Sequence, residues 1–144
     1  MNANRNYPVS QDLGLTPIKR MMSKTVMVAG PDTTLERAMQ MMINHKISGL
    51  AVTDATNKVL GVFSEWDAIL QGAVKPLESP LQYHGPAVTA HQDSLFRDVL
   101  AILIKSKVKR VLIVDDNDRL VGLMSRSDVM KAIYNDFEKN KDNG

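Results

Sequence analysis

The chain has 144 residues, 18 basic and 16 acidic side chains, and no cysteine. The length suits about one domain, and the lack of cysteine excludes disulfides, thiolate metal sites and a cysteine nucleophile. A net charge of +2, few aromatic residues, no apolar run of roughly 18 residues and no signal-peptide pattern together predict a cytoplasmic protein with no nucleic-acid and no membrane partner.

One segment of the sequence occurs twice, 61 residues apart. Residues 24–72 align with residues 85–133 without a gap. A match without insertions predicts two copies of one fold with equal loop lengths. The identical pairs include Ala29 with Ala90, Asp32 with Asp93, Ile43 with Ile104, Lys46 with Lys107, Asp54 with Asp115, Gly61 with Gly122, Ser64 with Ser125, and Asp67 with Asp128.

Each copy begins with a short extended segment, 26–29 or 87–90, followed by a helix. The apolar positions of both helices recur at i, i+3, i+4, i+7 and i+8, which is one helical face. They are Leu35, Ala38, Met39, Met42 and Ile43 in the first copy, and Phe96, Val99, Leu100, Leu103 and Ile104 in the second. Thr33 with Glu36 predicts a capping box for the first helix, and Asp93 or Ser94 is expected to cap the second.

Two strands and a second helix complete each copy. Apolar runs at 50–52 and 111–114 predict buried strands, and turn residues lead into return strands at 59–63 and 120–124. The final helix of each copy is expected to start near Glu65 or Arg126. The sequence therefore predicts an α/β (α+β) fold of tandem β-α-β-β-α repeats. The expected boundaries are an N-terminal arm (1–16), a first repeat (17–75), a linker (76–84), a second repeat (85–138) and a flexible tail (139–144).

The pattern Gly-h-h-Ser-x-x-Asp, where h is apolar, occurs at 61–67 and again at 122–128. One interpretation is structural, because Ser-x-x-Asp at a helix start resembles a capping box. The other is functional, since a helix N-terminus attracts phosphate and a carboxylate accepts hydrogen bonds from a sugar diol. The two interpretations are compatible, and the residues alone leave both open.

The two copies and their motifs resemble a pair of CBS (cystathionine β-synthase) domains over roughly residues 17–135. The resemblance implies a stand-alone, Bateman-type module with pseudo-symmetric clefts between its repeats. Such clefts bind AMP, ADP, ATP or S-adenosylmethionine as regulatory ligands, and no cofactor is required. The aspartate of each motif holds the ribose hydroxyls and the serine assists, which implies ligand-binding roles for Asp67, Ser64, Asp128 and Ser125.

The resemblance implies further ligand contacts at the start of each buried strand. Lys109 and Arg110 would face the cleft of Asp67, whereas Thr25 and Ser48 would face the cleft of Asp128. Arginine suits a phosphate through its planar fork of donors, so the first cleft is predicted to be the better nucleotide site. A solvated strand end is the alternative interpretation of the two basic residues.

Other functions have less support in the sequence. His45, His84 and His91 lack the spacing of metal ligands, and no catalytic motif occurs, so we expect neither a metal site nor an enzyme. The remaining hypotheses are a ligand sensor that signals to an unknown effector protein, and a ligand-free dimerisation or protein-interaction module. CBS pairs commonly form homodimers through their helices, which predicts the same for this chain.

Overall fold

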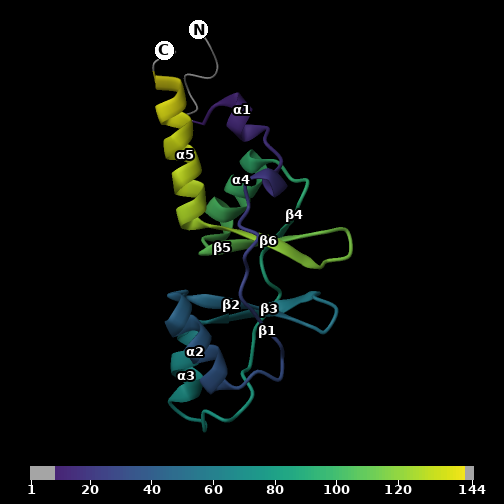
Figure 1. Cartoon of the computed structure of the whole chain (residues 1–144), viewed down its shortest axis with the longest axis vertical. Helices are drawn as coiled ribbons and strands as arrows, with labels where there is room; N and C mark the ends of the chain where they lie inside the picture. The colour runs from purple at the N-terminus through teal and green to yellow at the C-terminus, as the bar shows by residue number, and fades with distance from the viewer. Residues whose placement is uncertain (1–8, 142–144) are drawn as a thin grey trace. The chain divides into compact units, whose positions relative to one another are not determined.

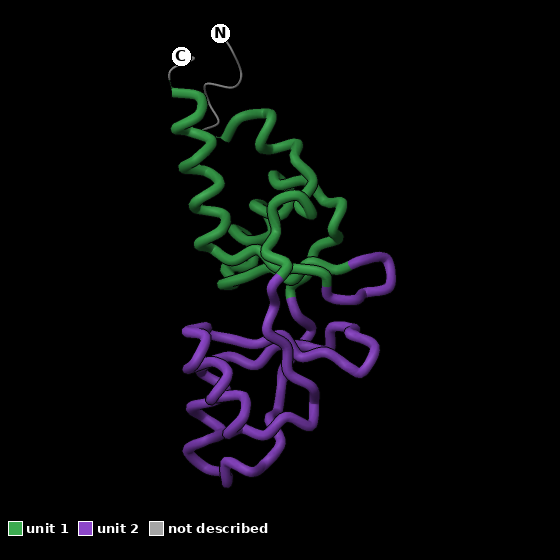
Figure 2. The backbone as a smooth tube through the Cα atoms, viewed as in Figure 1, with its two compact units in different colours: residues 1–24, 88–114, 121–144 green, residues 25–87, 115–120 purple. Residues whose placement is uncertain are grey.

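The computed structural model describes residues 9–141, so positions 1–8 of the predicted arm and 142–144 of the predicted tail lie outside the described residues. The chain forms two compact units (Figures 1 and 2). Unit 1 contains the chain up to residue 24, residues 88–114 and the chain from residue 121, and unit 2 contains residues 25–87 and 115–120. No described helix is long and apolar enough to cross a bilayer.

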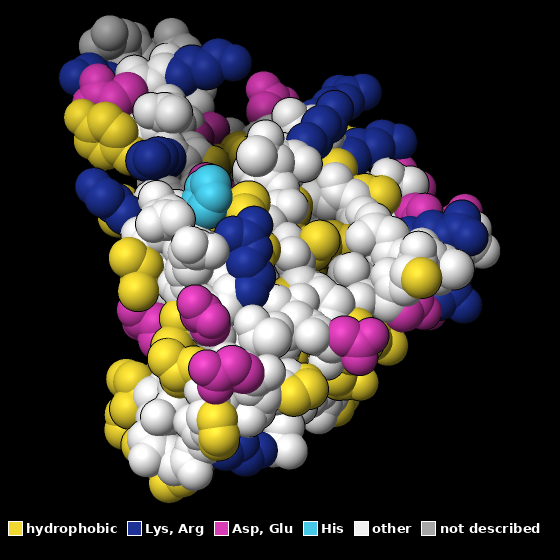
Figure 3. Space-filling view, turned by 60° about the horizontal axis from the view of Figure 1, so that its bottom comes forward, with side chains coloured by type: hydrophobic (Ala, Val, Ile, Leu, Met, Phe, Trp, Pro, Cys, Tyr) yellow, Lys and Arg dark blue, Asp and Glu magenta, His cyan; other side chains and the backbone are white. Residues whose placement is uncertain are grey.

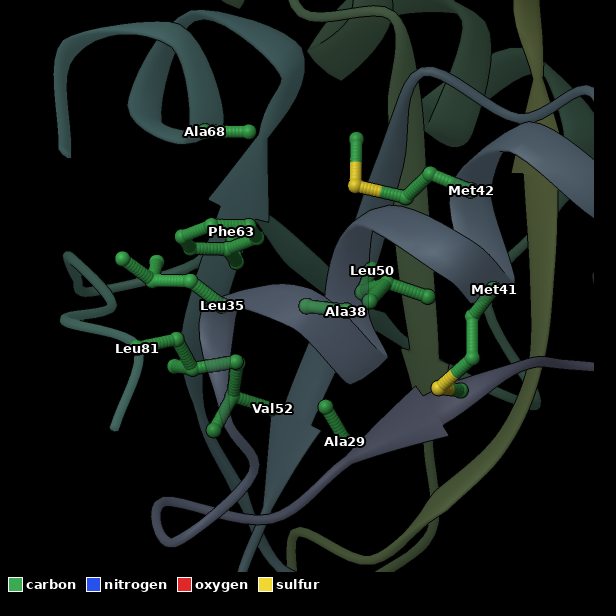
Figure 4. Close-up of a cluster of buried hydrophobic side chains, with 10 residues drawn as sticks. All are labelled: Ala29, Leu35, Ala38, Met41, Met42, Leu50, Val52, Phe63, Ala68 and Leu81. Atoms are coloured by element: carbon green, nitrogen blue, oxygen red, sulfur yellow. The ribbon is translucent and has the colours of Figure 1, made fainter. Parts of the chain in front are cut away.

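Unit 2 holds most of the first repeat. Its sheet has the order β1 (Val28–Ala29), β2 (Gly49–Thr53), β3 (Val59–Ser64), with β1 parallel and β3 antiparallel to β2. Helices α2 (Leu35–His45) and α3 (Glu65–Gly72) cover one face of this sheet (Figure 1). The core between them is lined by Ala29, Leu35, Ala38, Met41, Met42, Leu50, Val52, Phe63, Ala68 and Leu81 (Figure 4).

Unit 1 repeats this arrangement. Its sheet has the order β4 (Thr89–His91), β5 (Arg110–Val114), β6 (Leu120–Ser125), and its helices are α4 (Phe96–Ser106) and α5 (Arg126–Asn140). Two short helices precede them in the chain, α1 (Gln11–Gly14) and the 3-10 helix η2 (Ile18–Arg20). Ile18 is fully buried in the core of this unit. The predicted α+β fold of tandem repeats is therefore confirmed, and α1 is an element that the sequence analysis did not predict.

The segment that leads into each repeat pairs with a strand of the other repeat. His84 exchanges two backbone hydrogen bonds with Val62 of β3, at 2.9 and 3.0 Å. Ser23 exchanges two with Leu123 of β6, both at 3.0 Å. Since 23 and 84, like 62 and 123, are 61 residues apart, the two pairings are equivalent positions of the repeat. This exchange explains why unit 1 includes the chain up to residue 24, and unit 2 includes residue 84.

The predicted helix caps are wrong by one residue. Thr34, not Thr33, caps α2 by accepting from the Arg37 N–H at 3.1 Å. The Thr33 hydroxyl instead accepts from the Gly30 N–H at 3.0 Å, which closes the preceding turn. Leu95 occupies the N-cap of α4 without a side-chain hydrogen bond, so neither Asp93 nor Ser94 is the cap.

The predicted apolar helix face is also narrower than the periodicity suggested. Ile43 is 74% exposed and Ile104 is 66% exposed, although the periodicity places both on the apolar face. The i+8 position lies at the edge of the stripe, and the buried side of α2 includes Met41, whose position is expected to widen the apolar face. Figure 3 shows one face of the molecule, on which hydrophobic side chains reach the surface between charged ones.

Candidate functional site

The first motif forms a capping box at the start of α3. Ser64 ends β3 and is the N-cap of α3, and its hydroxyl accepts from the Asp67 N–H at 3.1 Å. Oδ2 of Asp67 accepts from the backbone N–H of Ser64 at 2.8 Å and from its hydroxyl at 3.0 Å. The structural interpretation of the motif is therefore correct for this repeat, and it fixes the direction of the carboxylate.

The second motif has the same geometry at the start of α5. The Ser125 hydroxyl accepts from the Asp128 N–H at 3.1 Å, and Oδ2 of Asp128 accepts from the Ser125 N–H at 3.0 Å. A hollow of about 510 Å³ on unit 1 is lined by Asp128 of α5 together with Leu13 and Met21 from the N-terminal segment. The two motifs thus place two aspartates in equivalent positions, one on each unit.

The hairpin register brings the start of each buried strand to the start of the final helix. Gly49 of β2 lies opposite Ser64 of β3, and the carbonyl of Ser48 accepts from the Glu65 N–H at 3.0 Å. The carbonyl of Lys109 accepts equivalently from the Arg126 N–H at 3.0 Å. Ser48 therefore lies next to the motif of its own repeat, and Lys109 next to the motif of the second.

Of the other two predicted contacts, one adjoins Lys109 and the other lies in a separate segment. Arg110 is the first residue of β5 and is half-buried, whereas Thr25 is exposed in the segment before β1. Lys109 and Arg110 belong to unit 1 and Asp67 to unit 2. That these three residues serve one ligand stays a prediction, as does the equivalent prediction for Thr25 and Ser48 with Asp128.

A histidine lies beside the first aspartate. Nε2 of His84 is 3.0 Å from Oδ2 of Asp67, and their side chains are 59% and 20% exposed. The backbone pairing of His84 with Val62 holds the ring in this place. The sequence predicts no site role for His84, because its pairing with β3 is a tertiary contact that leaves no local sequence pattern.

The arrangement leaves one carboxylate oxygen available. Within residues 9–141, all partners of the Asp67 carboxylate contact Oδ2, and Oδ1 accepts no hydrogen bond. The N–H groups of Glu65 and Asp67 already have acceptors, so the start of α3 offers a phosphate fewer donors than an uncapped helix. The geometry therefore suits a hydroxyl donor at Asp67 better than an anion.

The CBS domain family model matches this chain twice, at residues 18–71 and 83–135. The two matches cover the two repeats, so the chain belongs to the CBS domain family. Uncharacterized protein MJ1232 of Methanocaldococcus jannaschii is 32% identical over 119 residues, which are 81% of this chain and 39% of that protein. The chain spans about a quarter to two fifths of the length of several curated relatives.

Solved structures of CBS domain pairs share the fold. The CBS domain pair of protein MJ0100, crystallised with 5′-methylthioadenosine and S-adenosyl-L-methionine, is 27% identical, with a TM-score of 0.68 and coverage of 81% of this chain and 98% of that one. CBSX2 in complex with AMP has a TM-score of 0.74 at 22% identity, and covers 83% of this chain and 96% of that one. The second likeness is one of fold alone.

Proposed function

We propose that this chain is a regulatory module that binds an adenosyl ligand at Asp67, with a second, related site at Asp128. The observation that carries the proposal is the capping box that directs the Asp67 carboxylate and leaves Oδ1 without a hydrogen bond among the described residues. A fixed carboxylate oxygen accepts well from a ribose hydroxyl. The adenosyl compounds bound by the pair from MJ0100 carry such a ribose.

The remaining site residues extend this proposal. Lys109 and Arg110 would bind the phosphate of a nucleotide held by Asp67, and Thr25 with Ser48 would serve the site of Asp128. The ligand would regulate an effector protein through differential affinity for two states of the module. In this proposal the chain contributes no catalytic group of its own and acts in the cytoplasm.

A second candidate function is a dimerisation or protein-interaction module without a ligand. Specific support comes from exposed apolar side chains at repeated positions: Ile43 with Ile69 on unit 2, and Ile104 with Met130 on unit 1. A groove of about 380 Å³ between α2 and α3 is lined mainly by apolar side chains, including Met39, Ile43 and Ile69. Exposed apolar surface of this kind is typical of interfaces, and a homodimer formed through these helices is compatible with either function.

Thermal denaturation with a ligand panel distinguishes the two functions. AMP, ADP, ATP and S-adenosylmethionine are each added at millimolar concentration, with GMP as the control for the base. A ligand at 100 times its Kd stabilises the folded state by about 2.7 kcal/mol, which raises the Tm by roughly 9 °C for a chain of this size. An unchanged Tm with every adenosyl compound would contradict the ligand-binding function and leave the interaction module.

A further inference from the structure

The two aspartates differ in whether a histidine lies beside them. Asp67 has the imidazole of His84 at 3.0 Å from Oδ2. The equivalent residue of the second repeat is Ser23, whose backbone makes the same pair of hydrogen bonds, with Leu123 in place of Val62. The repeat therefore supplies an internal comparison, in which one aspartate has an imidazole beside it and the equivalent position of the other repeat has a serine.

We infer that His84 determines the ligand specificity of the Asp67 site by acting as a counterion that adapts it to a phosphorylated adenosyl compound. This inference rests on the proposed function and deepens it. An ionised aspartate repels the phosphate of a nucleotide that it holds by the ribose. A protonated imidazole beside Oδ2 cancels that charge, while Oδ1 stays available for a ribose hydroxyl.

Histidine side chains in general change charge between about pH 5 and pH 8, so the experiment below compares the two ends of that range. Among residues 9–141, Asp67 is the acid that lies within 4.0 Å of the His84 ring. The other titratable groups on the elements around it are Glu65 on α3 and Tyr83 next to it in the chain. Neither makes an ion pair or hydrogen bond with the ring within the described chain.

Lys109 and Arg110 are the basic residues that the sequence assigns to the same ligand. Because a substitution of His84 leaves them unchanged, their contribution is common to the variant and the wild-type protein. The pH dependence of the ratio of the two affinities is therefore independent of these two basic residues.

The repeat also provides the matched substitution. Serine at position 23 forms both backbone hydrogen bonds of the exchange, so His84→Ser preserves the backbone role of this position. His45→Ser is the control variant, because His45 is exposed at the end of α2 and makes no ion pair with Asp67 within the described chain. Both variants remove one histidine.

The test is calorimetric titration of AMP and adenosine into the wild-type protein and both variants, at pH 5.5 and pH 8.0. A charge pair about 7 Å apart with solvent-like screening changes an affinity roughly threefold. We expect His84→Ser to weaken AMP binding about threefold at pH 5.5 and little at pH 8.0, and to leave adenosine binding unchanged. The phosphate keeps one full negative charge at pH 5.5, so the effect expected there does not need its second ionisation.

Three results would overturn the inference. The first is an AMP affinity ratio that is the same at both pH values, and the second is an equal effect of His84→Ser on adenosine. Each would leave the proposed function standing, because AMP still binds. The third is a wild-type protein that binds neither compound, which would refute the proposed function and the role of His84 together.

Discussion

Substitution of Gly61 by alanine tests the close approach that positions His84. A Cβ on Gly61 would overlap the backbone carbonyl oxygen of His84 and lie 2.8 Å from Cδ2 of Tyr83. Gly61 does not have a positive φ, so it provides space here and not an unusual backbone conformation. The clash would break the two hydrogen bonds between Val62 and His84, at 2.9 and 3.0 Å.

The expected loss follows from these contacts. Two backbone hydrogen bonds contribute roughly 2 kcal/mol, and crowding of a tight space adds about 2 kcal/mol. Replacing glycine stiffens the unfolded chain, which returns roughly 0.7 kcal/mol. Gly61→Ala should therefore lower the free energy of unfolding by about 3 kcal/mol, or the Tm by roughly 10 °C.

Urea denaturation measures this change, and Gly30→Ala is the matched control. A Cβ on Gly30 would meet no atom within 4 Å, and its φ is not positive, so the unfolding free energy should change by less than about 1 kcal/mol. Equal stability of the two variants would refute the argument that glycine at position 61 is required by the strand exchange.

Three further predictions concern other parts of the chain. The Thr56 hydroxyl and then the Lys58 N–H hold the pKa of Asp54 below its ordinary 3.8, which stabilises the fold above that pH and is lost as the pH falls through the lowered pKa. Thr56→Ala should raise this pKa in an NMR titration, and an unchanged pKa would contradict the assignment. Asp136 accepts hydrogen bonds from the N–H and the hydroxyl of Ser10, which is the N-cap of α1. Asp136→Ala should therefore speed hydrogen exchange of the amides of α1 at least tenfold. Unchanged exchange would show that these bonds do not stabilise α1. If the repeated apolar positions form a homodimer, Ile43→Lys should weaken it in sedimentation equilibrium more than Val74→Lys, which changes an exposed valine whose equivalent is polar.

The regular part of the fold was accessible to sequence reasoning because it depends on local pattern. The repeat, the order of elements and the position of each Ser-x-x-Asp at a helix start all follow from periodicity and capping chemistry. Boundaries were less accessible, as the shift from Thr33 to Thr34 shows, since two adjacent threonines offer equivalent capping oxygens. The geometry of the hydrogen bonds decides which threonine caps the helix, and the spacing of residues in the sequence does not predict that geometry.

The strand exchange could not be predicted from local pattern. His84 and Ser23 pair with strands distant in the chain or in the other repeat, and neither flanking segment has an alternating or apolar run. The same limit applies to Ile43, where periodicity marks a stripe but not its exposed edge. Tertiary contacts settle both points, so the contact of His84 with Asp67 came from the structure.

Calorimetric titration of AMP into the wild-type protein, Asp67→Asn and Asp98→Asn tests the central claim most directly. Asparagine keeps an oxygen for the Ser64 N–H but removes the charge, and Asp98 is an exposed acid in the first turn of α4. The account predicts that Asp67→Asn weakens binding at its site at least tenfold, with a Tm no more than a few degrees lower in the absence of ligand, and that Asp98→Asn binds as the wild type does. Equal AMP affinity of Asp67→Asn and wild type would contradict it.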